Sequence, residues 1–170
     1  MLTQEHLKEL LHYDPDTGIF TNLTQRANAV KIGSVAGAKK PSGYIYISVD
    51  NKLYRLHRLD WLYVYGEFPE KSLDHINEIK DDNSIINLRL ATRQENAQNI
   101  SSPQLNNTSG FRGVSWNKGV KKWTAAININ GRKKHLGVFD TAEEAHECYV
   151  KFKKQNHPFW IPINKASEES

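Results

Sequence analysis

The N-terminal part of the chain is the first of three parts whose hydrophobic and polar positions predict secondary structure. Residues 2–13 carry apolar side chains at helical spacing, and the run 14–18, with its Pro and Gly, ends that helix. Apolar and polar character alternates clearly at residues 44–49, as in a half-buried strand. The elements predicted here are strands at residues 18–23, 44–49 and 53–56 and a second helix at residues 57–65.

The last third of the chain has a pattern of its own. Residues 123–129 alternate as a half-buried strand does, and Asn130 with Gly131 is a strong hairpin signal. Thr141 followed by Glu144 predicts a capping box at the start of a helix. One apolar face of that helix is formed by Ala145, Cys148, Tyr149 and Phe152. The only cysteine is therefore interpreted as core packing, and the segment as an antiparallel sheet on one helix.

Between these parts, residues 73–99 form the third pattern. Two short strand-like runs, 73–76 and 85–88, are separated by the turn formers Asp81, Asp82 and Asn83. Thr92 followed by Glu95 is a second capping-box signal, so a helix is expected to begin there. The segment is therefore predicted to be a two-stranded ribbon followed by a helix.

Polar residues at fixed spacing accompany this ribbon. Asp74 and His75 are adjacent, Asn87 follows Asp74 by thirteen positions, and Asn96 follows it by twenty-two. Any one of these residues alone would be an ordinary turn or surface residue. When these residues are taken together at this spacing, the segment closely resembles the HNH nuclease motif, in the variant whose last histidine is replaced by asparagine. The resemblance implies a ββα ribbon and helix around one divalent metal, and hence cleavage of nucleic acid.

The resemblance also implies a role for each residue. His75 is the expected general base, because an imidazole of ordinary pKa can take a proton from water at neutral pH. Asp74 and Asn96 are the expected metal ligands, and hard oxygen donors suit Mg²⁺ or Mn²⁺, one per chain, better than zinc. Asn87 is expected to hold the ribbon through side-chain to backbone hydrogen bonds. All four, together with His57, are counted among the catalytic set.

Two features beside the motif leave questions open. Relatives commonly carry a small residue such as glycine where this chain has Glu78, and the extra carboxylate could perturb the approach of metal or DNA. A His-Arg-Leu run like that at His57 and Arg58 often precedes the motif in relatives. These two side chains either reach the scissile phosphate or brace the site, and an ordinary packed histidine is the alternative for His57. Arg58 and Arg89 are also expected to contact DNA.

Residues 108–160 resemble the plant-type Apetala/ethylene-response-factor DNA-binding domain. The matching pieces are Arg112-Gly113-Val114, Trp123 with Ala125 and Ile127, Leu136-Gly137, and the run from Phe139 to Ala145. The resemblance implies a three-stranded antiparallel sheet packed on one helix, and similar domains accompany HNH nucleases in phage homing endonucleases. The departures are Ser115, Ala126, Asn128 and His135, so the base preference of the plant proteins does not carry over.

Charge separates the two faces of this segment. No Asp or Glu lies between Phe111 and Phe139, whereas the acids gather at the helix that follows. A basic sheet is what duplex DNA would require, with arginine able to read guanine. Trp123 is expected in the core and Trp116 at the surface. The predicted DNA contacts here are Arg112, Trp116, Lys118, Lys121, Lys122, Arg132, Lys133 and Lys134.

The whole chain of 170 residues, with a formal net charge of +4, is consistent with this interpretation. One cysteine excludes a disulfide framework, and without a signal peptide or membrane-length apolar run we expect a protein of the cytoplasm of a phage-infected bacterial cell. The predicted fold class is α+β, with an HNH nuclease domain at 1–103 and a DNA-binding domain at 108–165. The expected function is site-specific cleavage of double-stranded DNA by a monomer or homodimer, without a membrane. The alternatives are a non-catalytic DNA-binding regulator with an inactive nuclease domain, or an RNA-binding module.

Overall fold

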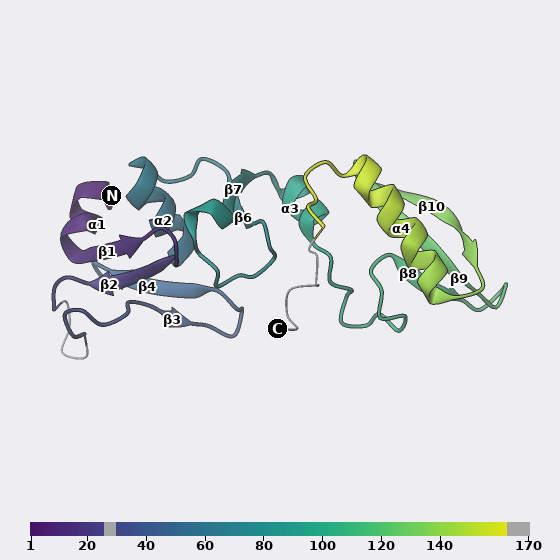
Figure 1. Cartoon of the computed structure of the whole chain (residues 1–170), viewed down its shortest axis with the longest axis horizontal. Coiled ribbons are helices and arrows are strands. Elements are labelled where there is room, and N and C mark those ends of the chain that lie inside the picture. The colour runs from purple at the N-terminus through teal and green to yellow at the C-terminus, as the bar shows by residue number, and fades with distance from the viewer. Residues whose placement is uncertain (26–29, 163–170) are drawn as a thin grey trace. The chain divides into compact units, whose positions relative to one another are not determined.

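The structure is a computed structural model that describes residues 1–25 and 30–162, so residues 26–29 and 163–165 of the two predicted domains lie outside the described part. The chain forms two compact units, Met1–Thr92 and Arg93–Ser170 (Figure 1). Helix α3 thus falls in the second unit, although the sequence prediction ran the first domain to residue 103. No helix among the described residues is long and apolar enough to cross a membrane.

The first unit combines two helices with three small antiparallel sheets. Its elements are α1 (Gln4–Leu10), β1 (Leu11–Asp14), β2 (Ile19–Asn22), β3 (Ala38–Lys39), β4 (Ile45–Val49), β5 (Lys52–Arg55), α2 (Leu56–Tyr65), β6 (Ser72–His75), the 3-10 turn η1 (Ile85–Asn87) and β7 (Leu88–Ala91). Strands β1 and β2 form a hairpin, β4 lies between β3 and β5, and β6 pairs with β7. Leu7, Phe20 and Leu59 are fully buried in the apolar core of the unit.

Two of the elements predicted for this unit differ in the structure. Residues 85–87, expected in the second strand of the ribbon, form the 3-10 turn η1, and the strand itself lies at Leu88–Ala91. The helix expected at residues 2–13 ends at Leu10, and Leu11–Asp14 continues as a strand. Leu11 and Tyr13 are buried and alternate with more exposed neighbours. In so short a run, the apolar positions fit the two-residue period of a strand as well as the 3.6-residue period of a helix. Pairing with β2 across the tight turn decides in favour of the strand, since the hairpin supplies a ladder of hydrogen bonds that a helix end lacks.

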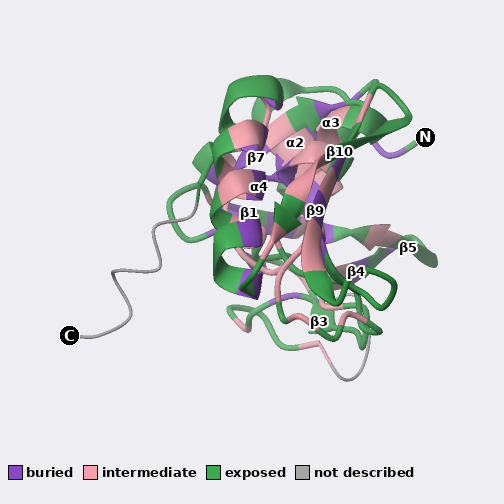
Figure 2. Ribbon diagram, turned by 90° about the vertical axis from the view of Figure 1, so that its right-hand side faces the viewer, coloured by how far each residue is buried: buried purple, intermediate pink, exposed green. Residues whose placement is uncertain are grey.

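The second unit has the three-stranded antiparallel sheet packed on a helix that the sequence predicts. Its elements are α3 (Arg93–Asn99), β8 (Val114–Asn117), β9 (Lys122–Ile129), β10 (Arg132–Phe139) and α4 (Ala142–Asn156). The sheet order is β10-β9-β8, and α4 contributes Ala145 and Tyr149 to a core shared with Val114, Ala125 and Ile127. Buried stretches of α4 and β9 are coloured purple in Figure 2. The predicted α+β fold class is confirmed.

Local signals in the second unit were accurate. The capping box of α4 is formed by Thr141 and Glu144 as predicted. Trp123 packs against the core, whereas Trp116 is 43% exposed. Cys148 is only half-buried, so it lies at the margin of the core rather than within it.

Candidate active site

The ribbon of β6 and β7 fixes the side chains of Asp74 and His75. Asp74 pairs across the ribbon with Arg89, and His75 pairs with Leu88. Successive residues of a strand point to opposite faces, so the two chemically important neighbours are presented in different directions. His75 is only 5% exposed, which places its imidazole inside the first unit.

The hydrogen bonds of His75 define which ring nitrogen is basic. Its Nε2 lies 3.1 Å from Oδ1 of Asn83, and Nδ2 of Asn83 donates to the carbonyl oxygen of Asp81 at 3.1 Å. The second bond fixes the orientation of the amide, so its oxygen faces the histidine and can only accept. Nε2 of His75 therefore carries the hydrogen, and the basic lone pair is on Nδ1.

Burial sets the charge of this histidine. Desolvation lowers the pKa of His75 below its ordinary value, while the bond to Asn83 and the carboxylates of Asp74, Asp82 and Asp81 partly oppose that shift. The ring is therefore neutral at physiological pH. A neutral imidazole with a fixed tautomer is the form that can accept a proton from water.

The N-terminal hairpin holds the asparagine that orients His75. The hydroxyl of Tyr13 donates to the carbonyl oxygen of Asn83 at 2.9 Å, and the amide of Ile85 donates to the carbonyl of Pro15 at 3.1 Å. Gly18 has φ +69°, and a Cβ there would lie 2.2 Å from the carbonyl carbon of Asn83. Only glycine allows this close backbone approach.

Asn83 is the site residue that sequence reasoning missed. It was interpreted as one of three turn formers, and nothing in the local pattern separates it from Asp81 and Asp82. Its burial, at 1% exposure, comes from contacts made by residues some seventy positions away. A buried amide must be hydrogen-bonded, which explains why its side chain is so well fixed.

His57, at the start of α2, lies against His75. The two rings meet edge to face at 5.2 Å, and the ring of Tyr44 lies 5.5 Å from His57 and 5.9 Å from His75. Burial lowers the pKa of His57 to about 3, and the nearby His75, in its protonated form, and the cations Arg55 and Arg58 lower it further. A neutral ring at 5% exposure has the contacts of a residue that braces His75. Arg58 lies over the ring of Phe68.

The expected metal ligand Asp74 is engaged by an arginine of the partner strand. Nε and Nη2 of Arg89 both donate to Oδ2 of Asp74, at 3.0 and 2.9 Å. The side chains are only 18% and 13% exposed, so the ion pair is partly shielded from water. Arg89, which was predicted to contact DNA, therefore neutralises the carboxylate that was predicted to bind the metal.

Asn87 fastens the turn between the two strands. Its Oδ1 accepts from the backbone amide of Asn77 at 3.0 Å, and its Nδ2 donates to the carbonyl of Asp82 at 2.7 Å. Within the same turn, Glu78 has φ +63°, a left-handed conformation that glycine adopts without strain. This conformation is a physical reason to expect glycine at that position in the HNH motif.

Asn96 lies on α3 in the second unit. Its side-chain Oδ1 is buried and has no hydrogen-bond partner among the described residues. A buried carbonyl oxygen without a donor is costly, and coordination of a cation is one way to satisfy it. The described residues contain no cluster of three or more His, Cys, Asp or Glu side chains that could hold a metal. Any metal bound here would rely on few protein ligands, as Mg²⁺ commonly does.

The basic residues predicted to contact DNA are exposed on the second unit, with one exception. Arg112 is half-buried and donates from Nη1 to the carbonyl of Ser102 at 3.0 Å. Lys133 pairs in register with Asn128 on the outer face of the sheet. Lys134 instead lies over the ring of Phe152 of α4, and Lys122 pairs with Asp140 at 2.8 Å. The sequence did not distinguish these environments.

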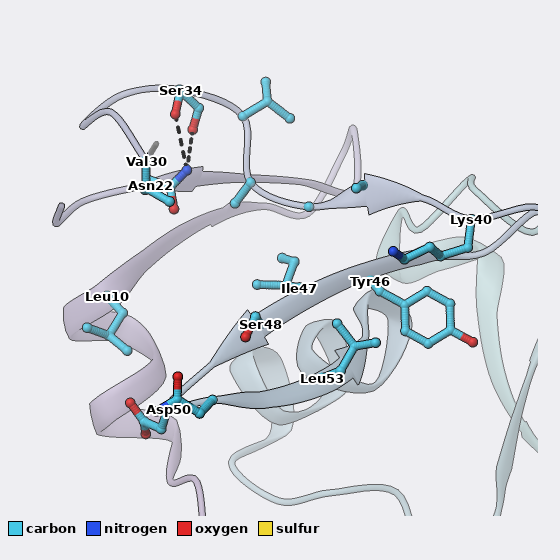
Figure 3. Close-up of a pocket in the computed structure, with 15 residues that line it drawn as sticks. Leu10, Asn22, Val30, Ser34, Lys40, Tyr46, Ile47, Ser48, Asp50 and Leu53 are labelled. Atoms are coloured by element: carbon cyan, nitrogen blue, oxygen red, sulfur yellow. Dashed lines mark hydrogen bonds between the residues drawn. The ribbon is translucent and has the colours of Figure 1, made fainter. Parts of the chain in front are cut away.

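A groove of about 720 Å³ lies elsewhere in the first unit, between the loop at residues 34–38 and the sheet of β4 and β5 (Figure 3). Leu10, Ile47 and Leu53 line it, and Nδ2 of Asn22 donates to the carbonyl and hydroxyl oxygens of Ser34 at its edge. No residue predicted to be catalytic lines this groove. The groove is therefore separate from the candidate site at the β6-β7 ribbon.

Comparison with known proteins agrees with this location. Residues 54–98 match the model of the family described as HNH endonuclease. The chain is 28% identical over 113 residues to Protein 3.8 of Escherichia phage T7, which covers 60% of this chain and 93% of the phage protein. It is 34% identical over 110 residues to an uncharacterized HNH endonuclease of Acanthamoeba polyphaga mimivirus, which covers 64% of this chain and 55% of that protein.

A solved structure of the HNH homing endonuclease I-HmuI is also similar, with 21% identity and a TM-score of 0.40 over 81% of this chain and 76% of that one. The segment matched by the family model includes α2, both strands of the ribbon and nearly all of α3. It contains His57, Asp74, His75, Asn83 and Asn87. Residues 54–98 are therefore the part of the chain that is similar to the HNH endonuclease family.

Proposed function

We propose that this protein is a metal-dependent, site-specific DNA endonuclease of the homing type. The observation that carries the proposal is the state of His75, which is buried, neutral and fixed in one tautomer by Asn83. Such a residue is prepared to remove a proton from water at Nδ1. The hydroxide so formed attacks the phosphorus of a phosphodiester and the bond to the leaving oxygen breaks. The leaving oxygen takes up a proton from solvent, and His75 returns to solvent the proton it removed from water.

Asp74 and Asn96 are the residues that would hold the metal. The orphaned Oδ1 of Asn96 and the carboxylate of Asp74 are hard oxygen donors, which fit Mg²⁺ or Mn²⁺. When bound, such a cation supplies positive charge for the phosphate and the leaving oxygen. Arg89 must release at least part of its hold on Asp74 for that carboxylate to serve as a ligand.

The second unit is proposed to hold duplex DNA through its exposed sheet face. Lys133 on that face is a flexible point charge suited to phosphate, and Thr124, Ala126 and Asn128 present small side chains that leave the backbone close to a ligand. Site preference would come from this face. The half-buried Arg112, tied to Ser102, contributes to the fold of the unit as well as to any base contact.

A DNA-binding regulator with an inactive nuclease domain remains the alternative, and the Asp74–Arg89 ion pair is the observation that favours it. In that case Arg89 would permanently replace the metal. The two functions differ in one measurable property, since only the nuclease converts a supercoiled plasmid to its nicked or linear form when Mg²⁺ or Mn²⁺ is added.

Plasmid cleavage by the full chain is the decisive experiment. Wild type should cleave with Mg²⁺ or Mn²⁺ and stop with EDTA. His75→Ala should lose about 10²–10⁴-fold in rate while binding DNA as before, because general-base removal typically costs that much. His12→Ala removes an exposed histidine of the same unit and should cleave normally. Equal cleavage rates for wild type and His75→Ala would exclude His75 as the general base. If the wild type does not cleave the plasmid with or without metal, the regulator is favoured.

A further inference from the structure

Two cations converge on one aromatic ring beside His75, and the proposed chemistry does not use them. The guanidinium of Arg55 lies 4.8 Å and the ammonium of Lys80 lies 5.2 Å from the centroid of the Tyr44 ring. The same ring contacts His57 and His75. Both cations are exposed, and they come from different parts of the unit, the end of β5 and the turn after β6. The fold therefore gathers positive charge at the site.

This positive charge has no acidic partner among the described residues. Nε of Arg55 donates to the hydroxyl of Tyr46 at 3.1 Å, and Nζ of Lys80 donates to the carbonyl of Ser42 at 3.1 Å. Neither forms an ion pair within the described part of the chain. Lys39 nearby shows the contrast, because its ammonium pairs with Asp81 at 2.6 Å. Like charges on one ring repel, so their arrangement is suited to an anion from outside.

The helix that follows Arg55 adds to this field. Arg55 is the N-cap of α2, and no side chain caps the first backbone N–H groups of that ten-residue helix. The N-terminus of a helix carries partial positive charge and favours anions. After burial and His75, the charge of Arg55 also contributes to the lowered pKa of His57.

We propose that Arg55, Lys80 and Tyr44 form a phosphate-binding subsite that holds the DNA backbone next to His75. This inference rests on the proposed function and adds a partner for the nuclease unit itself. The ring of Tyr44 orients the two cations and links them to the histidine pair. Arginine offers a planar fork for phosphate oxygens, and lysine a movable point charge. Tyr44 is a positioning residue, because it acts through its neighbours.

The salt dependence of DNA binding in EDTA tests the subsite without relying on cleavage. Each phosphate contact releases counterions, so log K falls with log salt by about 0.9 for each contact. Arg55→Gln and Lys80→Gln should each lower the slope of the full chain by roughly one ion, and the double variant by about two. Lys8→Gln is the matched control, because Lys8 also lies over a tyrosine ring, that of Tyr63, in the same unit. Slopes equal to that control would overturn the proposal.

Tyr44 separates a phosphate subsite from a structural brace. Tyr44→Phe keeps the ring and should bind with the wild-type slope, whereas Tyr44→Ala removes it and should lower the slope. Thermal unfolding of Arg55→Gln and Lys80→Gln tests the alternative that the two cations only stabilise the fold. In that case each substitution would lower the melting temperature and leave the salt slope of DNA binding unchanged. If the wild type binds DNA but never cleaves it, the proposed function fails. The salt slopes of the variants still show whether Arg55 and Lys80 contact phosphate. If the wild type does not bind duplex DNA, the subsite is overturned.

Discussion

The two units place their polar groups in opposite ways. In the first unit, His57, His75, Asn83 and Asn87 are buried together around one turn and ribbon. In the second, the core beneath the sheet is apolar and centred on Ala125 and Tyr149, and the lysines of the sheet lie at the surface, although Lys153 of α4 is buried. Proton transfer needs a fixed tautomer and a shifted pKa, which burial provides, whereas phosphate contact needs solvated, mobile charge. The difference therefore follows from the two tasks proposed for the units.

The buried arrangement of the first unit should be sensitive to small steric changes, and the largest effect is expected at Gly18. Gly18→Ala should lower the free energy of unfolding by about 3 kcal/mol, because its Cβ meets backbone and its φ is positive. Gly33→Ala is the matched control, with φ +78° and no atom within 4 Å of the added carbon, and should cost only about 1 kcal/mol. Denaturant unfolding measures both. Equal losses would show that the approach to Asn83 is not tightly packed.

Acid should destabilise the first unit through His57. Its pKa of about 3 in the folded state lies below the ordinary value of 6.5, so the unfolded chain takes up the proton first as the pH falls. The stability contributed by the neutral ring is present above pH 6.5 and is lost below it, by about 2 kcal/mol at pH 5. His57→Leu should remove this part of the pH dependence. If the stability of His57→Leu falls from pH 7 to pH 5 with the same slope as that of the wild type, the prediction is contradicted.

The ion pair of the ribbon should compete with metal. Arg89→Gln frees the carboxylate of Asp74 from a full positive charge and should tighten Mn²⁺ binding about tenfold, roughly 1.4 kcal/mol. Arg58→Gln removes an arginine that lies over Phe68 and should leave the affinity unchanged. Calorimetric titration of the full chain with Mn²⁺ gives both constants. An unchanged constant for Arg89→Gln would mean that the arginine and the metal do not compete.

The smallest effect is expected on the sheet of the second unit, where two adjacent lysines differ. Lys133→Gln should lower the salt slope of DNA binding by about one ion, because its side chain lies on the outer face. Lys134→Gln should leave the slope unchanged and slightly lower the melting temperature, since its ammonium lies over Phe152. A reversed result would place the DNA on the helix side of the sheet.

Much of the fold could be predicted because its signals are local. Three of these signals depend only on residues close in sequence: the Asn130-Gly131 turn, the capping box of Thr141 and the adjacent pair Asp74 and His75. The strand at Leu11–Asp14 was mistaken for helix, since only its pairing with β2 distinguishes the two periodicities. The role of Asn83, the ion pair of Arg89 and the environment of Lys134 could not be predicted either. Each arises from a contact that the chain makes across a sheet or over many residues.

Gly18 and the hairpin that contains it also limit which segment of the proposed nuclease could be moved into another protein. The family match begins at residue 54, yet the loop carrying Asn83 rests on Tyr13, Pro15 and Gly18. A segment transplanted at the boundary of the match would carry the histidine, the ribbon and their spacing. It would lack the hairpin that holds Asn83 and so sets the imidazole tautomer, and engineered fusions of the proposed nuclease should therefore retain the chain from its first helix onward.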